Sequence, residues 1–278
     1  MGYSTINKEN VQQTIIKCMP AFEDILSDRD WDRVIQHYLR RVDNIPKEYN
    51  GLITSSCLID LIICSLGDGK IAKANNETIN AINDEICKAL AFCDYHPQFM
   101  VKMKDLIRKT IMEMDNDIRV PNSAYKNWIN ELFVFNLLAN KKECEIVDIE
   151  RPMVNGNKCD FVCKIGNNEE VYFEVVTIQR IDPSQQDDST TMNDFIKERV
   201  KVKYQEKTKG LLSEDIPNIR ILPIIEYIDG LERFDISLNS DIATEPFAIM
   251  KNNMDDKVYI ELRPLHFYLS KIRTQMER

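Results

Sequence analysis

Two acidic residues in apolar surroundings are the residues of this chain that best predict chemistry. Asp160 lies in the segment 158–165, Lys-Cys-Asp-Phe-Val-Cys-Lys-Ile, and Glu174 lies in the segment 171–178, Val-Tyr-Phe-Glu-Val-Val-Thr-Ile. An unpaired carboxylate is costly in such surroundings, so each acid needs a cation or a hydrogen-bond donor. Two carboxylates on neighbouring strands would form an oxygen site for a hard divalent cation such as Mg²⁺.

A polar turn between the two segments predicts that they pair as a β-hairpin. Residues 166–169, Gly-Asn-Asn-Glu, are typical of a hairpin turn. Antiparallel pairing would bring Asp160 and Glu174 to the same end of the two strands. Mg²⁺ would relieve their repulsion, activate water and neutralise charge on a scissile phosphate. Each acid also has a structural interpretation, Asp160 as a cap at a strand start and Glu174 on the wet face of an edge strand.

A third acid, Glu131, falls on the apolar face of a helix expected over residues 123–139. Trp128, Leu132 and Phe135 share one arc of that helix, at about 100° per residue. Glu131 lies inside this arc, where a carboxylate needs a basic partner or a metal-bound water. A structural ion pair is the other interpretation.

The carboxyl-terminal part of the chain reads as alternating helices and strands. From residue 123 the order α, β, β, β, α, β predicts an α/β arrangement, a sheet that contains the hairpin and is flanked by helices. Pro223 weakens the prediction of the last of these strands, because proline cannot donate to a central ladder. The expected elements are a helix at 123–139, strands at 144–149, 158–165 and 171–178, a polar loop at 181–191, a helix at 192–209, and strands at 219–228 and 257–262.

The amino-terminal part, to about residue 120, shows helical periodicity throughout and no constellation that predicts catalysis. Val120-Pro121-Asn122 marks the expected boundary, so the sequence predicts an all-α domain at 1–120 and an α/β domain at 121–278. Ser27 or Asp28 can cap the second helix. The expected helices span 11–26, 31–42, 52–66, 79–92 and 99–114.

Composition narrows the class of protein. The 278 residues carry a formal charge of −9, and the sequence shows neither a signal peptide nor an apolar run that would span a bilayer. The eight cysteines form no C-x-x-C pair and the three histidines are scattered, which argues against zinc and favours a reducing cytoplasm. Only eight glycines and no phosphate-binding loop argue against a nucleotide-binding enzyme.

One segment, residues 197–209, is basic although the chain as a whole is acidic. Residues 197–209 hold six basic side chains against two acids, and a solvated helix face is the alternative to a nucleic-acid contact. The basic residues are Lys197, Arg199, Lys201, Lys203, Lys207 and Lys209.

These residues together resemble the PD-(D/E)xK nuclease superfamily over about residues 123–227, with the restriction endonucleases as the closest branches. Glu131 matches the helix glutamate often found there, and Cys159-Asp160 stands where the superfamily has Pro-Asp. Glu174-Val175-Val176 stands where it has Glu-x-Lys, and Lys203-Tyr204-Gln205 resembles the basic-Gln sequence of the following helix.

The resemblance implies a restriction-endonuclease-like mixed sheet flanked by helices and a Mg²⁺- or Mn²⁺-dependent endonuclease. Nucleic acid, with DNA expected, would be hydrolysed in restriction or phage defence. Asp160, Glu174 and the main-chain carbonyl of Val175 would ligate the metal, and Glu131 would assist as a catalytic residue. A homodimer, or a partner protein bound through the amino-terminal helices, is the expected assembly, with no membrane contact.

Val176 departs from the superfamily, since it replaces the lysine that would orient the attacking water. Some members recruit a lysine from the next helix, and here Lys203 is the first choice, with Lys201 or Lys207 next. Lys197, Lys201 and Lys207 are also expected to contact nucleic acid. The alternative is a nuclease fold that has lost hydrolysis and serves nucleic-acid binding or protein assembly.

Overall fold

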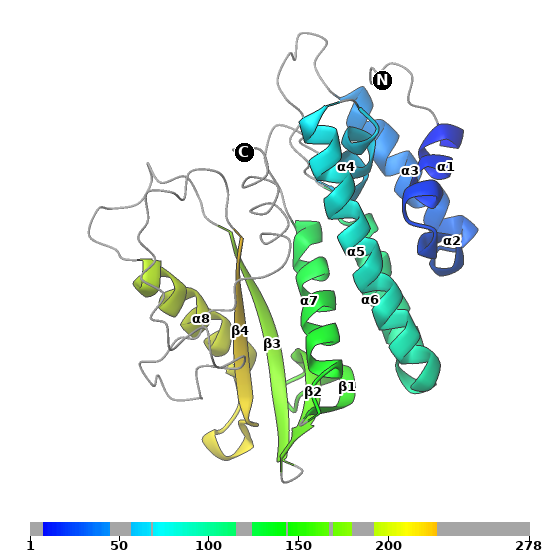
Figure 1. Ribbon diagram of the computed structural model, residues 1–278. Coiled ribbons are helices and arrows are strands. Elements are labelled where there is room, and N and C mark those ends of the chain that lie inside the picture. Colours follow the sequence, from blue (N-terminus) through cyan, green and yellow to red (C-terminus); the bar gives the residue numbers. More distant parts are fainter. Residues whose placement is uncertain are drawn as a thin grey trace. The chain divides into compact units, whose positions relative to one another are not determined.

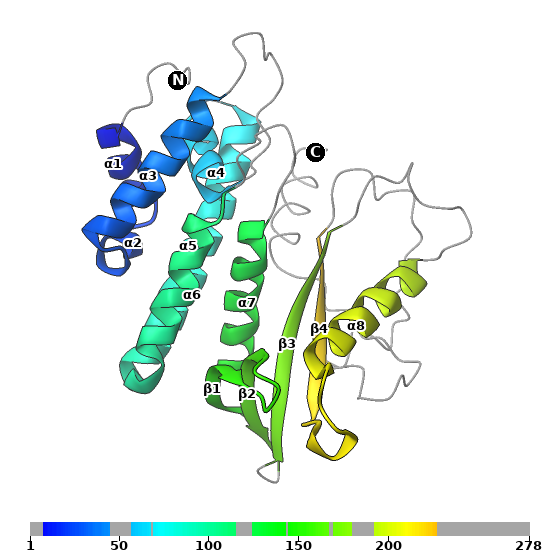
Figure 2. The ribbon, with the colours of Figure 1, turned by 180° about the vertical axis from the view of Figure 1, so that it is seen from behind.

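The structure is a computed structural model in which the chain forms two compact units, described one by one below (Figures 1 and 2). The first unit runs to Asn136 and the second begins at Leu137, so the division falls inside helix α7. The boundary expected at residues 120–121 lies outside the described residues. The structure describes residues 8–44, 57–67, 69–114, 124–142, 144–166, 169–179 and 192–226.

The regular secondary structure described in the first unit is all helical, as predicted. Pro20 splits the first expected helix into two, because proline cannot continue the hydrogen-bond ladder of a helix interior. Ser27 caps the next helix and forms a capping box with Asp30. None of the described helices combines the length and the apolar character needed to cross a bilayer. The helices are α1 Lys8–Cys18, α2 Ala21–Ile25, α3 Asp28–Asp43, α4 Leu58–Ser65, α5 Lys70–Tyr95, a 3-10 turn Pro97–Phe99, α6 Met100–Met112 and α7 Ala124–Ala139.

Helix α7 packs against α5 and α6 within the helical unit. The ring of Phe135 meets Phe92 edge-on, with centroids 5.3 Å apart. Lys109 Nζ lies 4.7 Å from the ring centroid of Trp128. The amide of Asn136 donates to the main-chain and side-chain oxygens of Glu85 at 2.8 and 2.7 Å. The apolar arc read from the sequence is therefore a packing surface inside this unit.

A buried ion pair joins α3 to α4 in the helical unit. Arg41 is 1% exposed and Asp60 0% exposed, and their side chains meet at 2.8 Å. The hydroxyl of Tyr38 donates to the other Asp60 oxygen at 3.2 Å, and Arg41 also donates to the Cys57 sulfur at 3.2 Å. Both charges are thus shut away from water and compensated inside the core.

The second unit is α/β, built on a four-stranded mixed sheet in its described residues, as predicted for the fold class. The strand order is β1-β2-β3-β4, with antiparallel pairing from β1 to β3 and a parallel pair of β3 with β4. A restriction-endonuclease-like topology in particular stays a prediction. The elements are β1 Cys144–Pro152, β2 Lys158–Ile165, β3 Glu169–Gln179, α8 Met192–Thr208, a 3-10 turn Ser213–Asp215 and β4 Ile219–Glu226.

Strand β4 explains how the sheet accommodates Pro223. Among the described strands β4 is an edge strand that pairs only with β3, and Pro223 lies opposite Val176. An edge position tolerates the missing N–H donor of proline. Helix α8, which connects β3 to β4, packs against both strands (Figure 2). The loop at 181–191 and the strand expected at 257–262 lie outside the described residues.

All eight cysteines are free thiols, in line with the absence of paired cysteine motifs. Half of them are buried and pack as small core residues. The remaining four are half-buried or, for Cys87, exposed. The buried cysteines are Cys57, Cys93, Cys159 and Cys163.

Candidate active site

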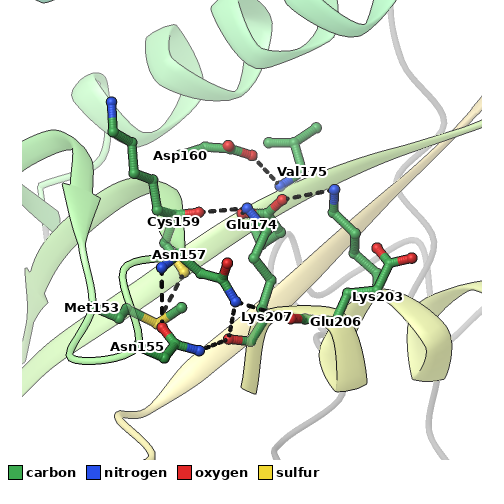
Figure 3. A network of polar contacts seen from close by, with 11 residues as sticks. Met153, Asn155, Asn157, Cys159, Asp160, Glu174, Val175, Lys203, Glu206 and Lys207 are labelled. Atoms are coloured by element: carbon green, nitrogen blue, oxygen red, sulfur yellow. Dashed lines mark hydrogen bonds and ion pairs between the residues drawn. The ribbon is translucent and has the colours of Figure 1, made fainter. Parts of the chain in front are cut away.

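The β2–β3 hairpin brings the two predicted acids together. The antiparallel register runs from the pair Ile165–Glu169 to the pair Phe161–Phe173. Asp160 and Glu174 are the next residues on the two strands beyond this last pair. The negative charge of Glu174 acts on Asp160, so the two carboxylates lie close to each other (Figure 3). The predicted hairpin is confirmed.

The Asp160 side chain is tied to the strand that carries Glu174. Its Oδ2 accepts a hydrogen bond from the main-chain N–H of Val175 at 2.7 Å (Figure 3). The N–H of Tyr172 donates to Asn218 on the β4 side, and N–H groups alternate sides along a strand, so the Val175 N–H faces β2. A carboxylate serves there as the acceptor, which fixes the acid beside its partner strand.

Two lysines from α8 compensate Glu174, which is only 1% exposed. Lys203 Nζ lies 3.0 Å from Glu174 Oε1, and Lys207 Nζ lies 2.8 Å from Oε2 (Figure 3). The two lysines are one helical turn apart and therefore share a helix face. Lys207 also donates to the main-chain carbonyl of Lys158. Lys203, the first choice to replace the lysine that is absent at Val176, therefore forms an ion pair with Glu174.

Burial and neighbouring charges together shift the pKa values of Asp160 and Lys203. Burial of Asp160 and the negative charge of Glu174 raise the pKa of Asp160 to about 7, although the Val175 N–H, Lys207 and Lys203 act in the opposite direction. Burial alone would lower the pKa of Lys203, but the attraction of Glu174 outweighs it and raises that pKa. Asp160 therefore exchanges its proton near neutral pH while Lys203 stays charged.

The donor set fits a hard divalent cation. Glu174 Oε2 is close to Lys207 but accepts no aligned hydrogen bond, so a buried oxygen retains capacity for another partner. The carboxylate of Asp160 and the main-chain oxygen of Val175 are the other candidate ligands. In the residues that the structure describes, no group of three or more His, Cys, Asp or Glu side chains gathers around one point. Ligation by two carboxylates suits Mg²⁺, which keeps several of its waters.

The other predicted site residues lie in different places. Glu131 is half-buried on α7 within the helical unit, so its joining the two acids stays a prediction. Lys201 is exposed on α8, where its ammonium lies 3.8 Å from Glu198. Lys197 belongs to the same helix, but its side chain lies outside the description. Lys207, expected as a nucleic-acid contact and as a next choice for the assisting lysine, lies with the carboxylates.

Sequence reasoning missed two asparagines that hold the last turn of α8, and it underrated Lys207. The spacing of Lys203 and Lys207 already places both on one helix face. The asparagines, Asn155 and Asn157, flank Gly156 immediately before β2. Asn-Gly-Asn is typical turn sequence, and nothing in it indicates a contact with a helix some fifty residues away, as its hydrogen bonds show.

Comparison of the chain with protein-family models, with curated proteins and with solved structures gives no match.

Proposed function

We propose that the chain is a metal-dependent endonuclease that hydrolyses phosphodiester bonds of nucleic acid, with DNA as the expected substrate in restriction or phage defence. One observation carries the proposal: α8 delivers the Lys203 ammonium to 3.0 Å from Glu174. Val176 occupies the strand position at which the resemblance would place a lysine, and Lys203 supplies the missing charge from the helix.

Asp160, Glu174 and the carbonyl of Val175 would hold Mg²⁺ or Mn²⁺. The bound ion would lower the pKa of a water and neutralise charge on the phosphate. The chain contributes the position of the ligands, because the Val175 N–H fixes Asp160 and two lysines fix Glu174. It also contributes a low-dielectric surrounding, in which charged donors act more strongly than in water.

Lys203 would orient the attacking water and stabilise charge that develops on the phosphate. Its side chain is 29% exposed, so its ammonium can leave Glu174 for a substrate oxygen without unfolding the helix. Lys201, which is 44% exposed, and Lys197 on the same helix would contact phosphates along the nucleic acid. Contacts of Lys197 and Lys201 with phosphates predict that the affinity for nucleic acid falls as the salt concentration rises.

Nicking of supercoiled plasmid in Mg²⁺ or Mn²⁺ tests the proposal. Wild-type protein is expected to convert plasmid to nicked or linear forms, and Asp160→Ala and Glu174→Ala are expected to abolish this conversion. Glu145→Gln, at an exposed acid on β1, is the matched carboxylate control and should cut as wild type does. A wild-type protein without nicking in either metal, or equal nicking by Asp160→Ala, would reject the proposal.

A second candidate is a nuclease-fold module without hydrolysis, which binds nucleic acid or assembles with protein. Val176 favours it, and so does the pairing of both Glu174 oxygens with lysines, since a site balanced in this way is stable without a metal. The two candidates differ in their response to Mg²⁺. A ligand that binds the folded state alone raises the free energy of unfolding with concentration, so an active site should be stabilised by Mg²⁺ and an inactive module should not.

A further inference from the structure

The turn between β1 and β2 holds the carboxyl end of α8 by two side-chain amides. Asn155 Nδ2 donates to the carbonyls of Lys207 at 2.8 Å and Lys209 at 3.0 Å. Asn157 Nδ2 donates to the carbonyls of Glu206 at 3.0 Å and Lys207 at 3.1 Å. The last carbonyls of a helix lack partners within the helix, so these amides satisfy them (Figure 3).

The turn orients the two amides before they meet the helix. The N–H of Met153 donates to the carbonyl of Asn157 at 2.7 Å, and the N–H of Gly156 donates back to Met153 at 2.9 Å. The N–H of Asn157 donates to Asn155 Oδ1 at 3.1 Å. Gly156 has φ of 81°, a conformation that glycine adopts without strain. Asn155 thus uses its oxygen within the turn and its nitrogen on the helix.

The same stretch of chain leads directly into the site. Asn157 precedes Lys158, whose carbonyl accepts from Lys207, and Asp160 follows on the same strand. The last turn of α8 is therefore held through its main chain by the asparagines and through the Lys207 side chain by Lys158 and Glu174. A shift of this turn would move the ammonium groups away from the acid.

We propose that Asn155 and Asn157 are positioning residues that set where Lys207, and with it Lys203, meets Glu174. Their meaning for catalysis rests on the proposed function, but their effect on the lysines does not. A merely structural role would stabilise the unit as a whole without a particular effect on these two ammonium groups.

Competitive acetylation of lysines, read by mass spectrometry on the full chain without nucleic acid or metal, measures this effect. Asn155→Asp keeps the side-chain oxygen used in the turn and removes the amide donor to α8. Lys207 is 18% exposed in the wild type, and its acetylation rate in Asn155→Asp is expected to rise on the order of tenfold, because the hydrogen bonds that fix its helix turn are lost. Lys203 is expected to follow to a smaller extent.

Three controls separate the effect of the asparagine clamp, the four amide hydrogen bonds from Asn155 and Asn157 to main-chain carbonyls of residues 206–209, from other effects of a substitution. Val154→Asp adds the same charge at a neighbouring residue that is 85% exposed, and it keeps the four amide bonds, so Lys207 should react as in the wild type. Asn136→Ala removes side-chain hydrogen bonds of an asparagine in the helical unit and should also leave Lys207 unchanged. Lys88, 57% exposed, is the internal reference within every sample.

An unchanged Lys207 rate in folded Asn155→Asp overturns the proposal, as does an equal rise in Val154→Asp. A uniform rise of all lysines, Lys88 included, shows a structural role alone. If Asn155→Asp does not fold, Asn157→Ala removes the other pair of amide bonds and is read in the same way. A selective rise of Lys207 in a protein that never nicks plasmid would retain the positioning role and reject the nuclease.

Discussion

Each unit of the molecule buries a carboxylate, and the two units compensate it differently. In the helical unit Asp60 and its partner Arg41 are both shut away from water, at 0% and 1% exposure. In the sheet unit Glu174 is equally buried, but its partners Lys203 and Lys207 keep 29% and 18% of their side chains exposed. The first pair is closed on both sides, whereas the second is open on the side of its cations.

The difference separates an ion pair that is closed to solvent from one whose cations reach solvent. A closed pair has no route by which its cation could be exchanged, and loss of either member leaves a charge in the core. The open cluster has flexible, partly wet cations and a second acid, Asp160, whose pKa is raised by burial and by Glu174. In such a cluster Asp160 can release its proton near neutral pH, and an ammonium group can be displaced from Glu174 by another cation, as the proposed chemistry requires.

The largest expected effect breaks the closed pair. Asp60→Ala leaves the guanidinium of Arg41 buried without its counter-charge and is expected to cost about 3–5 kcal/mol in free energy of unfolding. Urea unfolding measures this loss. Asp60→Leu combined with Arg41→Met removes both charges and should recover most of the loss, and no recovery would show that shape rather than charge dominates there.

The next effect concerns the open cluster as a catalyst. Lys203→Ala is expected to lower the plasmid-nicking rate by about 10²–10³-fold, the loss typical of one charge-stabilising donor in an active site. Lys88→Ala, on the helical unit, should nick as the wild type does. Equal rates for wild type and Lys203→Ala would transfer the assisting role to Lys207 or remove it altogether.

A smaller effect compares the two buried acids as stabilisers. Glu174→Gln is expected to lower the free energy of unfolding by about 1.5–3 kcal/mol, since hydrogen bonds to charged groups contribute that much and both lysines can turn to water. Urea unfolding beside Asp60→Ala gives the comparison. A loss as large as that of Asp60→Ala would show the cluster to be as closed as the helical pair.

The last comparison concerns the pH dependence of Asp160, which is half-buried, so that solvent screening reduces the effect of its raised pKa on stability. Folding raises its pKa from 3.8 to about 7, so the folded state favours the protonated acid. That contribution to stability is complete below about pH 4 and is lost as the pH rises through about 7. Measured in chelator, the free energy of unfolding of wild type relative to Asp160→Asn should fall over this window. A flat difference would contradict the raised pKa.

The hairpin and its acids were predictable because strand alternation and turn chemistry are local. Two short apolar segments, 158–165 and 171–178, with the turn sequence 166–169 between them, predict a hairpin, and strand geometry then determines which residues share a face. Lys203 was expected near Glu174 because the resemblance allows a lysine from the next helix to replace the one absent at Val176, and the ion pair agrees with that expectation. The hairpin, in contrast, follows from short-range patterns in the sequence.

The closed pair and the asparagine clamp were not predictable, because they join segments through tertiary packing. Arg41 and Asp60 lie on separate helices, and helical periodicity does not say which buried faces meet. Asn155 and Asn157 read as turn residues, since their contacts lie on α8. The break at Pro20 could have been predicted, because proline disrupts a helix interior. The single helix expected over residues 11–26 was wrong because it followed the apolar periodicity alone.

The hydrogen bond from the Val175 N–H to Asp160 makes this backbone amide a spectroscopic reporter of the site. The proton on that nitrogen is held by an ionisable side chain, so its magnetic environment changes when the carboxylate gains or loses charge. In a nitrogen-labelled sample, the Val175 resonance would trace the titration of Asp160 and the arrival of a cation without any substrate or added dye.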